Sequence, residues 1–353
     1  MTKKSSHLAT LGLTLSLPLL AMNAQADVSV LVYHHVSAET PPSTSTSPDL
    51  FEQQLDKIEE LDMEVVSLDH ESTAQALDGH DDDQLRVALT FDDAYESVYT
   101  TAWPILKERG IPFTIFVMTD AIDDGTSGYM TWEQLEELAE HELVTIGNHT
   151  VDHGALIQRT DESEEELRER IERNLDHANE RIEAETGVES NLFAHPYGEF
   201  SQPLTEALAE RDWYGFAQHS GVLGEHSDPR NIPRFPVADA FGGIDTLQDK
   251  LKARNFPVPY EDLPSPVLGE ENPPALTMTL PEDWDAGRLN CFAPRQGVME
   301  KDVKQEESGA RVTVQADDVI EARRSRYNCT YPAGDGRFYW LSQPWFNKDA
   351  PEG

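Results

Sequence analysis

Short apolar runs alternate with longer amphipathic or charged segments over roughly the first 255 residues of the chain. Runs rich in β-branched residues are typical of buried strands, and the segments between them have helical spacing. This strand-helix repeat recurs six or seven times, which predicts parallel β-crossover-β units and favours an α/β barrel. The predicted strands span 28–33, 64–67, 87–91, 113–118, 144–147, 191–194, 214–217 and 232–237, and the predicted helices span 50–61, 95–109, 132–140, 164–185, 204–209 and 243–252.

Polar and glycine residues at the ends of these helices support the assignment. Asp49, Asp69 and Thr131 stand where N-terminal caps are expected, because their side chains can accept hydrogen bonds from the first turn. Gly110 and Gly187 stand just past two predicted C-termini, where a left-handed residue commonly ends a helix.

The chain changes character after the predicted barrel. Six prolines between 257 and 274 indicate a linker, and short alternating segments at 276–280, 290–293, 311–314 and 337–341 predict a small β-domain over 275–353. Its aromatic residues are expected to fill its core, with stacking on sugar rings as the alternative. Both cysteines of the chain, Cys291 and Cys329, lie here, and an oxidising compartment would favour a disulfide between them.

The first 26 residues have the pattern of a cleavable export signal, with Lys3 and Lys4, an apolar run at 8–20 and a small-residue cleavage site ending at Ala26. The alternative is a membrane anchor, but the apolar run is shorter than a spanning helix needs. We therefore expect a secreted or periplasmic protein that is cleaved near Ala26 and has no stable membrane insertion.

The charge of the chain is strongly negative, with 27 basic residues, 66 acidic residues and a formal net charge of −39. Such a charge repels nucleic acids and anionic membranes, so we expect neither as a partner. The acidic residues are spread over the whole length rather than gathered in a tail. This spread predicts a halophilic protein, adapted to a medium whose salt screens the self-repulsion.

One acidic pair, Asp92-Asp93, directly follows a predicted buried strand in the motif Thr90-Phe91-Asp92-Asp93. The other runs of adjacent aspartates, at 81–83, 123–124 and 317–318, lie in polar surroundings typical of a solvated surface. Because α/β folds place their chemistry at the carboxyl ends of the strands, position makes Asp92 and Asp93 candidate site residues.

Two further motifs follow predicted strands. His149 and His153 come after the strand 144–147, and in a helix their spacing would place both imidazoles on one face, where they could bind one cation. The alternative is a surface loop, but together with a carboxylate the set becomes two histidines and one aspartate, a facial arrangement known from metal sites. Pro196-Tyr197-Gly198 predicts a tight turn, either an ordinary one or one that aims a backbone N–H at an oxyanion.

In this order and at these separations, the three motifs resemble the first three motifs of the NodB-type polysaccharide deacetylases, carbohydrate esterase family 4. The resemblance covers about residues 28–255. It implies a distorted (β/α)7 barrel over residues 27–256, before the linker at 257–274 and the small β-domain. It also implies metal-dependent removal of acetyl groups, with Asp92 as the base, Tyr197 as the oxyanion donor, and Asp93, His149 and His153 as ligands of a divalent metal, for which Zn²⁺ is the first candidate.

The start Tyr33-His34 further resembles the branch that deacetylates poly-N-acetylglucosamine, in which the matching histidine lies in the active site. Ala194 stands where many members carry the arginine that tethers the base, and Arg234 on a late strand is the candidate replacement. No Leu-x-His motif for the usual general acid follows Pro196-Tyr197-Gly198, so His34 is the first candidate acid, followed by His195 and His219.

The predicted function is hydrolysis of the acetamido C–N bond in an N-acetylglucosamine-containing polysaccharide, with release of acetate. Three alternatives stay open: an O-acetyl esterase on xylan-type glycans, an amidase on a small C–N substrate, and a non-catalytic carbohydrate-binding protein on a decayed barrel. The acetylated polysaccharide is the predicted partner, and neither its linkage nor the oligomeric state follows from the sequence.

Overall fold

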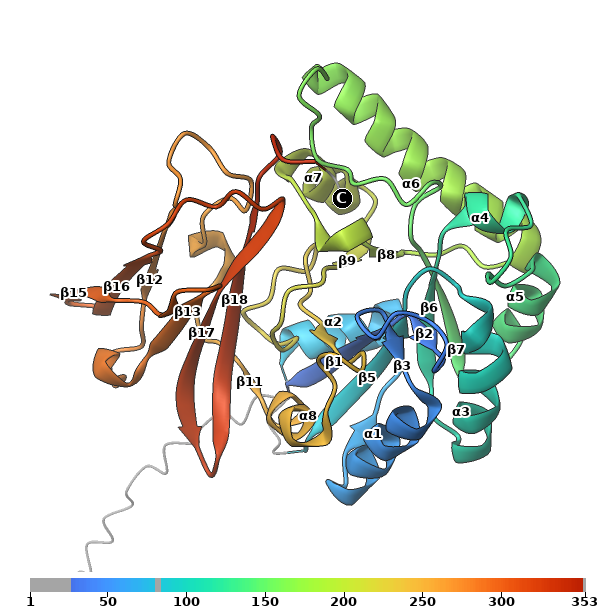
Figure 1. The fold of residues 1–353 in the computed structure, drawn as a ribbon, viewed down its shortest axis with the longest axis horizontal. Helices are drawn as coiled ribbons and strands as arrows, with labels where there is room; N and C mark the ends of the chain where they lie inside the picture. The colour runs from blue at the N-terminus through green and yellow to red at the C-terminus, as the bar shows by residue number, and fades with distance from the viewer. Residues whose placement is uncertain (1–26, 80–83, 352–353) are drawn as a thin grey trace, which may run out of the picture.

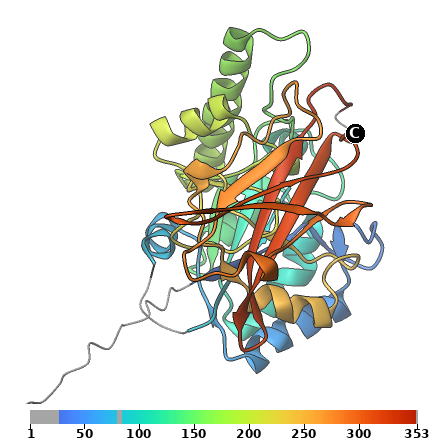
Figure 2. The same cartoon turned by 90° about the vertical axis from the view of Figure 1, so that its left-hand side faces the viewer.

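The computed structural model describes residues 27–79 and 84–351, so the predicted signal peptide at 1–26 lies outside the described residues. The described chain forms an α/β barrel and a C-terminal group of β-sheets that pack side by side (Figures 1 and 2). None of the described helices is long and apolar enough to cross a membrane.

The barrel is a curled sheet with the strand order β10-β1-β5-β6-β7-β8-β9, and β4 pairs with β5 off this path. All of its strand pairs are parallel. Ile232 bridges Phe216 of β9, and Phe235 of β10 pairs with Leu31 of β1, so the segment 232–236 connects the two ends of the sheet. This arrangement confirms the predicted distorted (β/α)7 barrel. The strands are β1 (Val28–Tyr33), β4 (Glu64–Val65), β5 (Arg86–Phe91), β6 (Phe113–Val117), β7 (Val144–Asn148), β8 (Leu192–Ala194), β9 (Tyr214–Phe216) and β10 (Phe235–Pro236).

Helices surround this sheet, as Figure 1 shows. Asp69 and Thr131 accept hydrogen bonds from the first turns of their helices, and Gly110 and Gly187 end theirs in the left-handed conformation, so these four predicted caps are confirmed. The prediction for Asp49 is wrong, because that residue lies inside the first turn of α1. The helices are α1 (Pro48–Glu60), α2 (His70–Asp78), α3 (Trp103–Arg109), α4 (Thr119–Asp123), α5 (Trp132–Ala139), α6 (Glu164–Thr186), α7 (Gln202–Glu210) and α8 (Ile244–Leu251).

The predicted helix at 95–109 is shorter and less regular than expected. It starts with a π-helical turn at Val98–Ala102 and becomes α-helical only from Trp103. Pro104 has no backbone N–H to donate to the preceding turn, which gives a physical reason for the wider turn in front of it.

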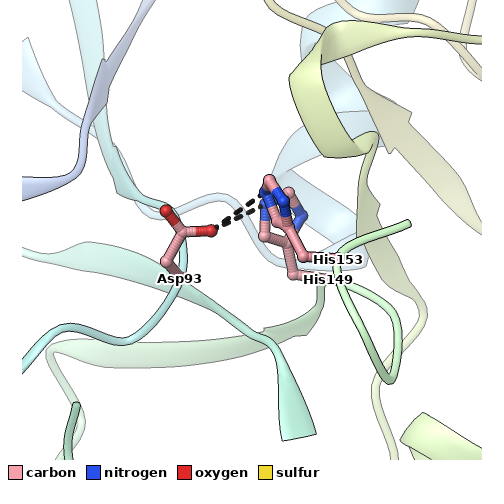
Figure 3. A group of neighbouring side chains, drawn as sticks. All are labelled: Asp93, His149 and His153. Carbon is pink, nitrogen blue, oxygen red and sulfur yellow. Dashed lines mark ion pairs between the residues drawn. The ribbon is translucent and has the colours of Figure 1, made fainter. Parts of the chain in front are cut away.

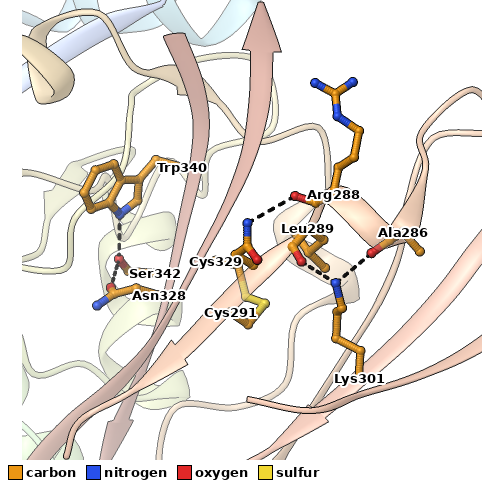
Figure 4. The surroundings of a disulfide bond; sticks show 10 residues. Ala286, Arg288, Leu289, Cys291, Lys301, Asn328, Cys329, Trp340 and Ser342 are labelled. Atoms are coloured by element: carbon orange, nitrogen blue, oxygen red, sulfur yellow. Dashed lines mark hydrogen bonds between the residues drawn. A yellow bond between two sulfur atoms is a disulfide. The ribbon is translucent and has the colours of Figure 1, made fainter. Parts of the chain in front are cut away.

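The C-terminal part contains a five-stranded sheet in the order β11-β18-β17-β13-β14 and a three-stranded sheet in the order β12-β16-β15. Cys291 on β13 and Cys329 on β17 are paired residues joined by a disulfide, so the predicted bond is confirmed (Figure 4). Trp345 is buried in the core of this part. The strands are β11 (Arg254–Asn255), β12 (Ala275–Thr279), β13 (Asn290–Ala293), β14 (Gly297–Val298), β15 (Lys301–Glu306), β16 (Gly309–Gln315), β17 (Arg324–Gly334) and β18 (Arg337–Phe346).

The hairpin of β17 and β18 lies against the barrel. Trp340 on β18 packs edge to face on Phe235 of the barrel, with ring centroids 5.3 Å apart. The proline-rich segment also attaches to this hairpin, because Phe346 donates to the Pro266 carbonyl at 2.7 Å and accepts from Leu268 N–H at 2.9 Å. The barrel and the C-terminal sheets are therefore in direct contact.

Candidate metal centre and catalytic site

The chemistry-bearing residues gather at the carboxyl ends of the barrel strands. Asp92 and Asp93 follow β5, His149 follows β7, and Tyr197 lies in the turn after β8. Because neighbouring barrel strands are parallel, segments far apart in the sequence meet at one end of the barrel.

Three side chains converge there on one point. Asp93 Oδ1 lies 3.3 Å from His149 Nε2 and 3.2 Å from His153 Nε2, as Figure 3 shows. One potential ligand atom from each of the three residues lies within 4.8 Å of the others. The Asp93 carboxylate is nearly fully buried and His149 is fully buried. The predicted convergence of these residues is therefore present in the structure.

These three residues fit a divalent metal. Asp93 Oδ1 and His149 Nε2 are buried atoms without a hydrogen-bond partner, although they lie only 3.3 Å apart. Buried polar atoms are rarely left unsatisfied, and such an exception needs an explanation. Two imidazole nitrogens and a carboxylate oxygen are the donor set that Zn²⁺ and related transition metals prefer. A cation between them would satisfy both atoms.

The backbone and its carbonyl groups fix the orientation of His149. Its Nδ1 donates to the Ala194 carbonyl at 2.8 Å, which leaves Nε2 as the atom that faces Asp93. A hydrogen bond of this kind sets the tautomer and the ring orientation of a metal-binding histidine.

The segment from 149 to 153 is a turn, so the helical geometry considered for the two histidines is wrong. Thr150 and His153 have φ values of 70° and 58°, and left-handed residues cannot continue an α-helix. The His153 N–H instead binds Thr150 Oγ1 at 3.0 Å. This turn brings the second imidazole back beside the first.

Strained backbone concentrates at this end of the barrel. Among the described residues, nine non-glycine residues have positive φ; four of them, Asp93, Thr150, His153 and Tyr197, belong to the three motifs, and Ala94 directly follows the first. Such conformations cost free energy and persist where the surrounding structure holds functional groups in place.

Asp92 is fully buried and forms a two-point ion pair with Arg234, Nη1 to Oδ1 at 2.7 Å and Nη2 to Oδ2 at 2.8 Å. Burial raises the pKa of Asp92, but the Arg234 guanidinium and His149 outweigh it and hold the pKa below the usual value. Arg234 thus binds Asp92, the carboxylate that an arginine at the position of Ala194 is expected to tether in many members of the family.

The sequence did not reveal Gln218, which also binds Asp92. Its amide Nε2 donates to Asp92 Oδ2 at 3.1 Å. A carboxylate oxygen accepts about two hydrogen bonds. Asp92 Oδ2 already accepts two, from Arg234 and Gln218, whereas Oδ1 accepts one from Arg234 and can accept one more. The only available signal was a polar residue two positions after β9, which is too common to single out.

Of the three candidate acids, only His34 lines the cavity that holds Asp93 and His153. Burial lowers the pKa of His34, although Asp92 and Asp93 raise it. His195 is fully buried, and its Nε2 donates to the Arg230 carbonyl at 2.8 Å. Burial lowers the pKa values of His195 and His219 to about 3, so neither would carry a proton near neutral pH.

The catalytic cavity has a volume of about 570 Å³, and its lining includes His34, Asp93, His153 and Tyr197. Arg326 also lines it, although this residue belongs to β17 of the C-terminal part. The pattern of the sequence predicts no strand at 324–334, so the contribution of Arg326 does not follow from it.

The chain matches the family model described as polysaccharide deacetylase over residues 79–214. It is 27% identical to the Bacillus subtilis protein YxkH over 162 residues, which are 44% of this chain and 53% of that protein. It is 28% identical to the Escherichia coli poly-β-1,6-N-acetyl-D-glucosamine N-deacetylase over 186 residues, 43% of this chain but only 28% of that protein.

The fold is similar to that of IcaB from Ammonifex degensii, with a TM-score of 0.55 and 26% identity over 63% of this chain and 97% of the other. Among the curated relatives, the matched segment covers about half of YxkH and about a quarter of the E. coli N-deacetylase. Fold, motif geometry and family model agree that the chain contains a polysaccharide deacetylase domain, which the family model matches over residues 79–214.

Proposed function

We propose that this chain hydrolyses N-acetyl groups of an N-acetylglucosamine-containing polysaccharide in a metal-dependent reaction. The observation that carries the proposal is the convergence of Asp93, His149 and His153 beside the tethered carboxylate of Asp92. The names of the E. coli relative and of other relatives, poly-β-1,6-N-acetyl-D-glucosamine N-deacetylases, support this substrate class.

Asp93, His149 and His153 would hold the metal, with Zn²⁺ as the first candidate. When bound, a divalent cation supplies Lewis-acid polarisation of the acetyl carbonyl and of the attacking water. Asp93 and His149 are buried, and the hydrogen bond of His149 to Ala194 holds its ring in place.

Asp92 would act as the base. Its lowered pKa keeps the carboxylate ionised, and Oδ1 retains the capacity to accept a proton from the attacking water. Arg234 and Gln218 hold the carboxylate in one orientation. The bidentate contact makes Arg234 a positioning residue rather than a catalytic one.

Tyr197 would stabilise the oxyanion through its backbone N–H. Its left-handed conformation, with φ of 58°, turns the peptide at the cavity. His34 would donate a proton to the leaving amine as the C–N bond breaks, because an unprotonated amine leaves poorly. The water oxygen ends in acetate, and the sugar keeps a free amine.

Acetate release from defined glycans tests this proposal. The purified protein should release acetate from β-1,6-linked N-acetylglucosamine oligomers, compared side by side with chitin oligomers, acetylxylan and small amides. Asp92→Asn should keep metal but lose turnover, and His34→Ala should lower the rate roughly 10²-fold. Release only from acetylxylan would assign an esterase, and bound metal without acetate release from any substrate would assign a binding protein.

Export and salt adaptation belong to the same proposal. Signal cleavage near Ala26 would deliver the enzyme to the periplasm or the medium, where an extracellular polysaccharide is accessible. The net charge of −39 predicts better stability in concentrated salt, because added ions screen the repulsion among carboxylates. Equal stability without added salt would contradict the halophilic part.

A further inference from the structure

The C-terminal sheet delivers one cationic side chain to the catalytic cavity. Tyr327, Cys329 and Tyr331 of β17 are buried in the core of the C-terminal part. Because successive side chains of a strand point to opposite faces, Arg324 and Arg326 lie on the other face, toward the barrel. Arg326 there lines the cavity that also holds His34, Asp93 and His153.

Arg326 differs from its neighbours in having no partner among the described residues. Arg323 binds both carboxylate oxygens of Glu199, Oε2 at 2.7 Å and Oε1 at 3.1 Å, and Arg324 binds Glu199 Oε1 at 3.0 Å. Within the described residues, the guanidinium of Arg326 has neither an ion pair nor a hydrogen bond, although the side chain is half-buried. Partly buried charges are normally paired, because the loss of hydration otherwise costs several kcal/mol.

Arg326 also lines a second cavity next to the catalytic one. This cavity has a volume of about 330 Å³ and is bordered by Tyr197, Gln218, Arg324 and Pro344 as well. Tyr197, Gln218 and Arg326 line both cavities, so a polymer with one sugar in the catalytic cavity has its neighbouring sugar within reach of the second. Tyr197 offers an aromatic ring at this boundary, 38% of the residue being exposed.

We propose that the second cavity binds the sugar adjacent to the one being deacetylated, and that Arg326 pairs with a carboxylate on that sugar. The preferred substrate would then be an acidic polysaccharide, in which uronic acid residues neighbour N-acetylated sugars. This inference rests on the proposed deacetylase function and adds the substrate class.

A carboxylate fits the site better than a neutral group. The planar guanidinium matches a carboxylate in a two-point contact, and the binding of an anion compensates a charge that the protein leaves unpaired. The negative charge of the whole protein does not prevent this, since salt screens charges farther away than about 10 Å at 0.1 M. A pair enclosed between two protein surfaces is screened much less.

A matched pair of substrates tests the inference. Oligosaccharides that alternate N-acetylglucosamine with glucuronic acid would be compared with the same oligosaccharides after reduction of their carboxyl groups to alcohols. For Arg326→Gln, the kcat/KM of acetate release from the acidic substrate should fall roughly tenfold to hundredfold. The value for the reduced substrate should change by less than about twofold.

Arg311→Gln is the control, because Arg311 is an arginine of the same C-terminal part that is exposed and lines none of the described cavities. It should leave both substrates unaffected. Arg326→Gln should also leave the thermal stability unchanged or raised, since the variant removes an uncompensated charge. Equal rates of the wild-type protein on the two substrates, or an equal loss on both in Arg326→Gln, would overturn the inference and leave the deacetylase proposal intact.

If no acetate is released at all, a binding measurement with the acidic oligosaccharide distinguishes the proposed acidic subsite from the proposed deacetylase activity. Calorimetric titration of the chelator-treated wild-type protein with the acidic oligosaccharide should show binding roughly tenfold or more tighter than that of Arg326→Gln. This result would support the acidic subsite while the proposed deacetylase activity fails. Equal binding by the two proteins would reject the subsite as well.

Discussion

The contact between Arg234 and Asp92 allows a quantitative test of how the base is held. Replacement of Arg234 by Met leaves the Asp92 carboxylate buried without its main counter-charge, since both side chains are fully buried. The replacement also removes two hydrogen bonds that Arg234 donates, from Nε to the Ala217 carbonyl at 2.8 Å and from Nη1 to Thr90 Oγ1 at 3.0 Å. We therefore expect Arg234→Met to be strongly destabilising.

The magnitude follows from these contacts. Removal of one partner of a buried ion pair costs about 3–5 kcal/mol, and a buried acceptor left without a donor costs about 1 kcal/mol or more. Arg234→Met should therefore lose about 5 kcal/mol of unfolding free energy, a large share of the total for a domain. Arg234→Lys keeps the charge but loses the two-point geometry, so it should cost about 2 kcal/mol and remain folded.

Urea unfolding of Arg234→Met, Asp92→Asn and the double variant gives the coupling energy of the pair, which should reach about 2–3 kcal/mol. The surface pair of Arg181 and Asp123, at 2.8 Å and partly exposed, is the control and should couple by less than about 1 kcal/mol. In Arg234→Lys, kcat of acetate release should fall more than KM rises. Equal coupling in the buried and the surface pair would refute the reasoning.

Three further predictions concern the metal, the pH dependence and the disulfide. His153→Ala should lose bound Zn²⁺ on dialysis while Asp92→Asn keeps it, and equal metal content by elemental analysis would argue against the ligand set. Burial lowers the pKa of His195 from 6.5 to about 3, so across that window the unfolded chain binds a proton that the folded chain does not. Stability should fall by about 1.4 kcal/mol for each unit that the pH drops. His195→Gln, which keeps a donor for the Arg230 carbonyl, should make the fall of the urea-unfolding free energy between pH 7 and about 4.5 shallower by about this amount, while His219, whose pKa burial also lowers to about 3, keeps its own contribution; parallel curves would contradict this. Cys291 and Cys329 close a loop with a sequence separation of 38, so a double serine variant should lose about 4 kcal/mol, and an unchanged unfolding midpoint would show that the loop is ordered by other contacts.

The strand-end motifs could be predicted because their positions follow from local sequence. A buried strand followed by Asp92-Asp93, and another followed by His149, reach the same end of a parallel barrel whatever the loops between them do. Arg234 could be named for the same reason, since it directly precedes β10, which closes the barrel beside β1. Periodicity and strand direction are sufficient for these residues.

The exact turn at His149 and His153 could not be predicted. Helical spacing was considered for the pair, but Thr150 and His153 adopt left-handed conformations. Non-glycine residues rarely adopt that conformation, and a β-branched residue such as Thr150 does so least of all, so tertiary contacts have to impose it, including the hydrogen bond of His149 to the Ala194 carbonyl. The predicted convergence of Asp93, His149 and His153 is present in the structure, whereas the helical geometry predicted for the two histidines is wrong.

Gln218 and Arg326 could not be found from the sequence because their roles depend on packing between distant segments. Arg326 stands 233 residues after Asp93 in the numbering (326 − 93 = 233) and on a strand whose barrel-facing side is polar. Glu199 adds to this dependence. It directly follows the Pro196–Gly198 turn, is fully buried, and binds Arg323 and Arg324 of the C-terminal part. Because a buried carboxylate without a counter-charge is costly, the conformation of the Tyr197 turn and the docking of the C-terminal sheet must form together. The barrel therefore carries the candidate metal ligands and the candidate base, while the sheet that docks on it sets the shape and charge of the neighbouring cavity.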